Sequence, residues 1–246
     1  MATNCQILIE VTTDRLAEFL DGAPWMPGLS AEQAERVHRE TVARHFSAGA
    51  VVCSRGTPSV HWLGVIEGML KVENVSQVGK SATLTGVPAG SWIGEGAVIK
   101  GELRPYDLVA IQDSTVAMMP RATFQWLMQE NHQFSEWLIH QLNARLGHFI
   151  ALVQTLRLND THSQVAYCLA SLFNRDLYPN TQRQLAISQE EIGRLAGVSR
   201  QIANRALHEM QDKGLIRIGY GSIEVLDLPA LQALANGEVD AADADR

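Results

Sequence analysis

The stretch from Arg200 to Gln211 carries side chains whose types and spacing suit one particular chemistry. Projected as a helix at about 100° per residue, it separates completely into a polar half and an apolar half. The polar half comprises Arg200, Gln201, Asn204, Arg205, His208, Glu209 and Gln211, and the apolar half comprises Ile202, Ala203, Ala206, Leu207 and Met210. Arginine, glutamine and asparagine form paired hydrogen bonds to guanine and adenine edges in the major groove of DNA. The polar half therefore predicts a surface that reads base edges.

Short signals on either side of this stretch predict the helices that would position it. Ser188 and Glu191 have the spacing of a capping box, which predicts a helix that ends before Gly197. Glycine at position 197 can supply a corner with positive φ. Ser199 is a suitable N-cap for a second helix, which Gly214 would close. Two helices joined by so short a turn predict a helix-turn-helix.

The residues after this unit predict a β-hairpin, or wing. Leu215–Ile218 and Ser222–Leu226 are strand-length runs that flank a glycine-containing turn. Arg217 and Tyr220 could contact phosphates, as could the backbone N–H groups near Ser199 at the start of the second helix. The alternative use of a winged helix is contact with another protein.

Residues 121–156 contain no proline and one glycine, which predicts a long helix. An apolar stripe runs along it in steps of three and four residues and comprises Phe134, Leu138, Leu142, Leu146, Phe149, Val153 and Leu156. At about 1.5 Å per residue, the striped part spans about 34 Å, which outruns a small barrel. The stripe therefore predicts a helix that pairs with its counterpart in a second subunit, the alternative being packing onto the chain's own sheet.

Upstream of this helix the chain is rich in short strands. Ten of the 19 glycines fall between Gly49 and Gly101. The strand-length runs are Val60–Ile66, Leu70–Val75, Ser81–Thr85, Asp107–Gln112 and Thr115–Met119. No helical pattern of 10–15 residues interrupts them, so a jelly-roll barrel is favoured over a parallel α/β sheet. Residues 13–43, with a capping-box start at Ser30 and Gln33, predict short helices ahead of the barrel.

The predicted architecture is therefore α+β, with an N-terminal β jelly-roll barrel, a long dimerisation helix and a C-terminal winged helix-turn-helix. The expected boundaries are 1–130 for the helical lead and barrel, 131–157 for the dimerisation helix and 158–235 for the winged helix-turn-helix. Residues 236–246 form an acidic tail that is expected to be disordered. Leu158–Asp160 is the expected hinge, with Asp160 capping the next helix.

Composition limits the remaining function classes. The net charge is −7, but residues 181–228 hold equal numbers of basic and acidic side chains, so the acidity lies outside the predicted DNA-binding segment. The three cysteines are far apart and predict neither disulfides nor a cysteine-held metal. No apolar run is long enough to span a bilayer, and the first residues do not resemble a signal peptide, so we expect a cytoplasmic protein without a membrane partner.

The helix-turn-helix residues resemble those of the Crp/Fnr family of bacterial regulators. The segment Gln189-Glu190-Glu191-Ile192-Gly193…Gly197-Val198-Ser199-Arg200-Gln201…Arg205 follows that family's DNA-reading signature. The resemblance covers nearly the whole chain and implies a cyclic-nucleotide-binding-like jelly roll, a homodimer on double-stranded DNA and RNA polymerase as a further partner. It places Arg200, Gln201 and Arg205 at base-contacting positions. Gln201 replaces a common glutamate, and Asn204 replaces a glycine found in some members.

The same resemblance implies an effector site in the jelly roll. Gly90–Glu95 is similar to the start of the family's phosphate-binding cassette, in which Glu95 would hold the ribose and Arg104 the cyclic phosphate. Two departures disfavour a cyclic nucleotide. Pro105-Tyr106 follows Arg104 where the family has a small hydroxyl residue and alanine, and proline offers neither hydroxyl nor N–H. Phe149-Ile150 replaces the hydroxylic pair that reads adenine in responders to cyclic AMP.

Several alternatives remain open beside a regulator gated by a small effector. The protein could act without an effector, and Glu95 and Arg104 could then be an ion pair that ties the barrel together. A cupin-like metal enzyme would need several barrel histidines, but residues 46–119 contain only His61. Gly94-Glu95-Gly96 lies in the β-rich segment and is too short to cradle a phosphate. Haem would need an axial histidine, and His132, His140 and His148 do not share a helix face. We therefore predict no catalytic residue, no metal site and no certain cofactor.

Overall fold

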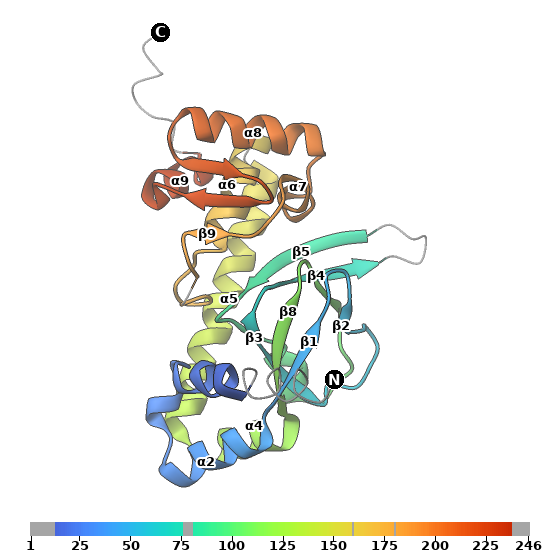
Figure 1. The fold of residues 1–246 in the computed structure, drawn as a ribbon, viewed down its shortest axis with the longest axis vertical. Helices are drawn as coiled ribbons and strands as arrows, with labels where there is room; N and C mark the ends of the chain where they lie inside the picture. The colour runs from blue at the N-terminus through green and yellow to red at the C-terminus, as the bar shows by residue number, and fades with distance from the viewer. Residues whose placement is uncertain (1–12, 76–80, 159, 180, 238–246) are drawn as a thin grey trace, which may run out of the picture. The chain divides into compact units, whose positions relative to one another are not determined.

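The computed structural model describes residues 13–75, 81–158, 160–179 and 181–237 (Figure 1). The chain divides into two compact units. The first takes in residues up to Leu70 and Val87–Asn143, and the second takes in Lys71–Gly86 and the residues from Ala144 onward. Asn159 of the predicted hinge and the predicted tail from residue 238 lie outside the described residues.

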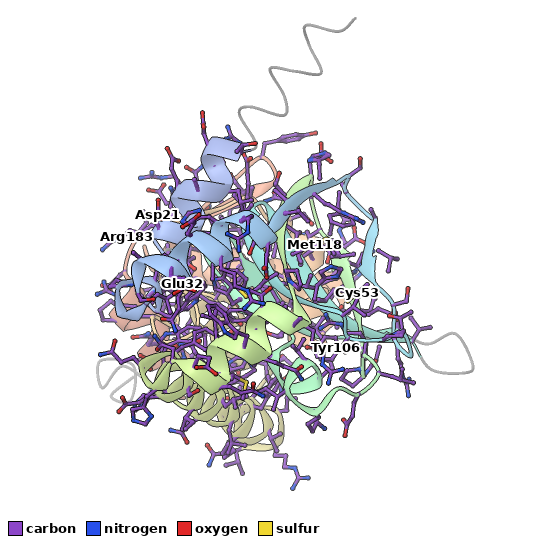
Figure 2. The ribbon with its side chains drawn as sticks, turned by 90° about the horizontal axis from the view of Figure 1, so that it is seen from below. Asp21, Glu32, Cys53, Tyr106, Met118 and Arg183 are labelled. Carbon is purple, nitrogen blue, oxygen red and sulfur yellow. The ribbon has the colours of Figure 1, made fainter. Side chains whose placement is uncertain are left out.

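The predicted short helices precede the barrel. Residues 13–21 are helical, followed by the 3₁₀ turn η1 (Met26–Gly28) and the helix α2 (Ala31–Glu40). The predicted capping box at the start of α2 is confirmed: Ser30 Oγ accepts from the Gln33 N–H at 3.2 Å, and Gln33 Oε1 accepts from the Ser30 N–H at 3.0 Å. Asp21 Oδ1, labelled in Figure 2, lies 2.9 Å from His38 Nε2 and ties the first helix to α2.

Two four-stranded sheets form the predicted jelly roll (Figure 1). The first has the order β1 (Val42–Phe46), β8 (Ser114–Pro120), β3 (His61–Glu67) and β6 (Trp92–Ile93). The second has the order β2 (Val51–Cys53), β7 (Asp107–Ala110), β4 (Met69–Val75) and β5 (Ser81–Pro88). Each predicted strand has a counterpart here. Strands β1, β2 and β6 were not predicted as separate strands, because they are short or lie at the edge of the glycine-rich segment.

Aromatic side chains dominate the core of the first unit. Trp62 of β3 and Trp92 of β6 stack with ring centroids 4.1 Å apart, and both lie within about 6 Å of the Trp25 ring. Phe134 packs edge-on against Trp62 at 6.0 Å. A Cβ at Gly64 would come within 2.7 Å of the Phe19 ring, so glycine lets that ring lie directly over β3. These aromatic contacts join β3 and β6 to the helical segments in the core of the first unit.

The long helix predicted from residue 121 is interrupted, which corrects the prediction. The structure has α4 (Arg121–Glu130) and α5 (His132–Leu158), separated by Asn131 in an extended conformation. Asn131 Oδ1 accepts from the Phe134 N–H at 2.7 Å, and its Nδ2 donates to the Gly28 carbonyl at 2.9 Å. Asparagine competes for backbone hydrogen bonds in this way, so it caps α5 instead of continuing α4.

The second unit contains the predicted winged helix-turn-helix. Helix α6 (Thr161–Ser171) begins as predicted at Asp160, whose Oδ1 accepts from the Ser163 N–H at 2.8 Å. Its other elements, in chain order, are β9 (Gln184–Leu185), α7 (Gln189–Ala196), α8 (Arg200–Asp212), β10 (Ile216–Gly219), β11 (Ser222–Val225) and α9 (Leu228–Ala235). The three strands form a small sheet in the order β10-β11-β9. Strand β9, which is two residues long, and helix α9 were not predicted from the sequence.

Within the described ranges, no helix is long and apolar enough to cross a bilayer. No group of three or more histidine, cysteine, aspartate or glutamate side chains is placed to hold a metal ion in the same ranges.

Candidate nucleic-acid interface

The turn between α7 and α8 forms as the sequence predicts. Ser188 Oγ accepts from the Glu191 N–H at 3.2 Å, and Gly197 ends α7 in the left-handed conformation with φ of 69°. Glu191 does not complete the capping box, because its carboxylate accepts from Arg194 Nη1 at 2.8 Å. Ser199 Oγ accepts from the Ile202 N–H at 3.3 Å and caps α8.

A close approach of α7 and α8 fixes the direction of the second helix. A Cβ at Gly193 would lie 3.1 Å from Ala203 Cβ and 3.4 Å from the Val198 carbonyl oxygen. Two small residues at the crossing therefore bring the helices close together. On the apolar side of α8, Ile202 is half-buried and the buried residues are Ala203, Ala206, Leu207 and Met210.

The N-terminal part of the polar side of α8 faces outward. Arg200, Gln201 and Arg205 are exposed, and they include the side chains best suited to hydrogen bonding with base edges. Asn204 is half-buried, and its Oδ1 has no hydrogen-bond partner among the described residues. Gln211 does not share the exposed surface, because its Oε1 accepts from the Ile218 N–H at 2.8 Å and fixes the wing to α8.

A chain of ionisable side chains crosses the middle of α8. Arg205 Nε donates to Glu209 Oε1 at 3.0 Å, and the other oxygen of Glu209 lies 2.7 Å from His162 Nδ1. His162 belongs to the first turn of α6, which packs against α8. The helical projection places Glu209 one turn from Arg205, so the sequence could predict that these two residues are neighbours. No pattern in the sequence predicts the contact between Glu209 and His162.

The wing has the predicted position and turn. Tyr220 is fully exposed at its tip, and Gly221 has φ of 65°. Arg217 is exposed and pairs across the hairpin with Glu224, with Nη1 2.7 Å from Oε2. Because this pair is solvated, it contributes little to stability, and Arg217 can be drawn to a phosphate at small cost.

Helix α5 presents an exposed apolar seam that differs from the predicted stripe. Phe134 and Leu138 are 0% and 3% exposed and belong to the core of the first unit, so they cannot face a second subunit. Farther along the helix, Leu142, Leu146, Val153 and Leu156 are 37–59% exposed, and Phe149 is half-buried. Ile139, at 65% exposure, extends this seam toward the start of α5. From Ile139 to Leu156 the seam residues alternate steps of three and four, which is the spacing of a two-helix contact.

The predicted effector residues fall into both units. Glu95 and Arg104 are buried in the first unit, at 4% and 3% exposure, whereas Phe149 and Ile150 belong to the second. Gly94 does not lie on a strand as predicted: it is the N-cap of a short helix, α3 (Glu95–Lys100).

Arg104 is engaged by the backbone of the barrel. Its guanidinium donates to the carbonyl oxygens of His61 and Gly94, the latter at 3.5 Å. A Cβ at Gly94 would collide with this guanidinium, so glycine is needed there for space as well as for its φ of 92°. Pro105 is exposed and Tyr106, labelled in Figure 2, is half-buried.

Two polar contacts of the second unit, at Lys71 and at His148, were not predicted from the sequence. Lys71 of β4 is 7% exposed, and its Nζ lies 3.6 Å from Glu73 Oε1 and 3.7 Å from Glu191 Oε2. The Tyr167 hydroxyl donates to the His148 carbonyl at 2.8 Å and lies 3.2 Å from His148 Nδ1. Burial, with a smaller contribution from Arg145, lowers the pKa of His148 to about 4. An alternating strand pattern does not reveal a buried lysine, and the histidine spacing along α5 did not predict the contact of His148 with Tyr167.

Comparison with known proteins gives a consistent result. A model of the cyclic nucleotide-binding domain matches residues 43–131, and a model of the Crp-like helix-turn-helix domain matches residues 163–234. The Cyclic AMP receptor protein of Thermus thermophilus is 25% identical over 218 residues, which cover 89% of this chain and 99% of the relative. The transcriptional regulator SdrP of the same organism is 27% identical over 80% of this chain and 95% of its own length.

A solved structure shares the fold. FixK2 from Bradyrhizobium japonicum superposes with a TM-score of 0.67 at 17% identity, covering 79% of this chain and 96% of that one. The two domain matches, in this order and around the long helix α5, show that the chain belongs to the Crp/Fnr family of transcriptional regulators.

Proposed function

We propose that the protein is a homodimeric regulator that reads a palindromic DNA site through α8 of each subunit. The observation that carries this proposal is the exposed N-terminal part of α8, where Arg200, Gln201 and Arg205 project from a helix whose opposite side is largely buried. A helix of this kind fits the major groove, and these side chain types discriminate between bases there. Gln201 would favour adenine, because glutamine pairs with its N6 and N7 atoms.

Contacts to the DNA backbone would set the register. The backbone N–H groups near Ser199 lie at the positive end of the α8 dipole, where a phosphate is stabilised. Arg217 and Tyr220 extend the surface onto the wing. Phosphate contacts supply affinity without sequence information, so these residues have a different role from Arg205.

The second subunit would pack along the exposed seam of α5. Apolar side chains that are about half exposed at regular spacing are costly in water and are covered in a two-helix contact. In helix-turn-helix dimers, the two recognition helices bind half-sites whose centres lie about 34–36 Å apart.

We propose further that DNA binding does not require cyclic AMP. The relative named Cyclic AMP receptor protein and the match to the cyclic nucleotide-binding domain make such a ligand conceivable. The residues present do not suit it: Arg104 already donates to two backbone carbonyls, and Pro105 has no N–H to offer. Phe149 and Ile150 lack the donors and acceptors that an adenine ring needs. A contact with RNA polymerase stays a prediction from the family resemblance.

Two arginine variants test the proposed division of roles. Arg205→Ala is expected to lower discrimination between the selected and a random duplex by about 1–3 kcal/mol, because it removes one base contact. Arg217→Ala is expected to weaken both duplexes equally and to reduce the salt dependence of binding by about one phosphate contact. Fluorescence anisotropy over a salt series measures both effects. Equal losses on both duplexes for Arg205→Ala would refute base reading, and the absence of salt-dependent binding would favour a winged helix that contacts protein.

A further inference from the structure

Glu209 is a carboxylate on the helix that is proposed to enter a groove lined by phosphates. A free negative charge there would repel DNA. Both of its oxygens are engaged: Oε1 accepts from Arg205 Nε at 3.0 Å, and Oε2 lies 2.7 Å from His162 Nδ1. Glu209 is less exposed than Arg205, with side chain exposures of 43% and 76%. The carboxylate therefore lies between the outer guanidinium and α6.

The geometry of this contact indicates that Glu209 holds Arg205 in position to bind DNA and does not withhold it from DNA. Glu209 engages Nε of Arg205, and the four N–H groups of the two Nη atoms remain to meet a base. An unsupported arginine loses rotamer freedom when it binds, and a side chain held in place beforehand loses less. His162 in turn anchors Glu209 to α6, whose first turn is fixed by the Asp160 cap.

We propose that Glu209 is a positioning residue that determines specificity by holding the Arg205 fork toward base edges, and that His162 keeps Glu209 in place. This inference rests on the proposed DNA-binding function and names a residue that sets its selectivity. The proposed role of Glu209 differs from that of the phosphate-contacting residues. A change at Glu209 should alter the ratio of specific to random binding more than it alters the affinity itself.

A double-mutant cycle tests the proposal. Glu209→Ala is measured alone and combined with Arg205→Ala, on the duplex best enriched by selection with the wild-type protein and on a random duplex of equal length. In the wild-type background we expect the affinity ratio to fall about 5-fold, since part of one base contact is lost. Binding to the random duplex should be unchanged or stronger, because a negative charge is removed. In the Arg205→Ala background the ratio should not change further.

Two further variants serve as a supporting test and a control. His162→Ala should lower the ratio by about 2-fold, again only while Arg205 is present. Asp212→Asn removes the same charge from the exposed end of α8 without touching Arg205, so it should leave the ratio unchanged. Thermal unfolding verifies that each variant is folded. If Glu209→Ala does not fold, Glu209→Gln replaces it with an expected loss of about 2-fold.

The results that would overturn the proposal are distinct. A ratio that is unchanged or higher in Glu209→Ala would mean that the carboxylate is passive or withholds Arg205 from DNA. A loss that persists without Arg205 would mean that Glu209 acts through another residue. If the wild-type protein shows no preference among duplexes, the proposed function itself fails, and the cycle is not what refutes it.

Discussion

Gly94 and Arg104 occupy one small volume of the first unit, and each limits what the other position can hold. Gly94 has φ of 92°, and a side chain there would meet the Arg104 guanidinium. A Cβ at Gly96, two residues later in the short helix α3, would meet no atom of the described residues outside its own helix within 4 Å, and Gly96 does not have a positive φ. The same substitution at the two glycines therefore has opposite expected effects.

We expect Gly94→Ala to destabilise the first unit by about 2–4 kcal/mol through left-handed backbone strain and displacement of Arg104. Gly96→Ala should be neutral or stabilising by up to about 1 kcal/mol, because alanine is the better helix former. All five tryptophans lie in the first unit, so urea unfolding followed by tryptophan fluorescence reports on it. Equal free energies of unfolding for the two variants would show that the close contact between Gly94 and Arg104 does not affect stability.

His148 predicts a specific dependence of stability on pH. Its pKa is about 4 in the folded protein and 6.5 without burial, so the unfolded chain binds more protons between these values. The contribution of the neutral His148 imidazole to the free energy of unfolding is therefore fully present above about pH 6.5, and it is lost as the pH falls toward 4. At about pH 5 the loss is on the order of 2 kcal/mol.

The His148→Gln variant should lack this part of the loss between about pH 7.5 and pH 5 in urea unfolding followed by circular dichroism. His140→Gln, at an exposed position on the same helix, should keep the wild-type dependence. Equal pH dependence in wild type and His148→Gln would mean that the imidazole is protonated at no cost in the folded state.

Single-residue roles were predictable from the sequence where they depended on neighbours in the same helix. The N-caps Ser30, Asp160 and Ser199 follow from local spacing and are confirmed. The partners of Gln211 and Glu209 were not predictable, because the Ile218 N–H and the His162 ring come from other elements. A helical projection predicts on which side of its helix a residue lies, but it does not predict which residues of other elements contact that side.

At the scale of elements, α5 shows the limit of periodicity. Phe134 and Leu138 continue the apolar stripe, yet they are buried in the core of the first unit, whereas the residues from Leu142 onward are exposed. Both environments favour apolar side chains at the same helical spacing, so the sequence pattern cannot separate them. The structure can, because it shows which residues the chain already covers.

We expect Leu146→Glu to separate the proposed dimer while leaving the monomer folded, since Leu146 is 59% exposed within the chain. Two buried leucines are lost and two charges are introduced, so the dimer dissociation constant should rise at least about 100-fold. Gln154→Glu, exposed beside the seam, is the charge-matched control and should leave the dimer intact. Sedimentation equilibrium measures the change, and an undiminished dimer mass for Leu146→Glu would place the subunit contact elsewhere.

At the scale of the whole molecule, the order of the domains was predictable from the sequence. Strand-length runs, a long helix and a helix-turn-helix signature were sufficient for the architecture, which the family matches bear out. The division of the chain places Lys71–Gly86, which reads as ordinary barrel sequence, with the second unit. The buried contact of Lys71 with Glu191 belongs to that unit, and it depends on a meeting of residues 120 positions apart that no local pattern encodes.

Charge distribution also belongs to this scale. The net charge of −7 argues against DNA only if it is spread evenly, and residues 181–228 are balanced. On α8 and the wing, Arg200, Arg205 and Arg217 are all exposed. The electrostatic field near the proposed interface is therefore set by these local charges more than by the net charge of the chain. Salt largely screens exposed charges that lie more than about 10 Å away.

Selection of bound duplexes from a random pool, with and without cyclic AMP, tests the central claim that two copies of α8 read base edges. The account predicts one enriched sequence under both conditions, built of two inverted half-sites whose centres lie about 34–36 Å apart. The same selection with Arg205→Ala should lose preference at one position of each half-site. A pool with no enriched sequence, or with a site lacking an inverted partner, would contradict it.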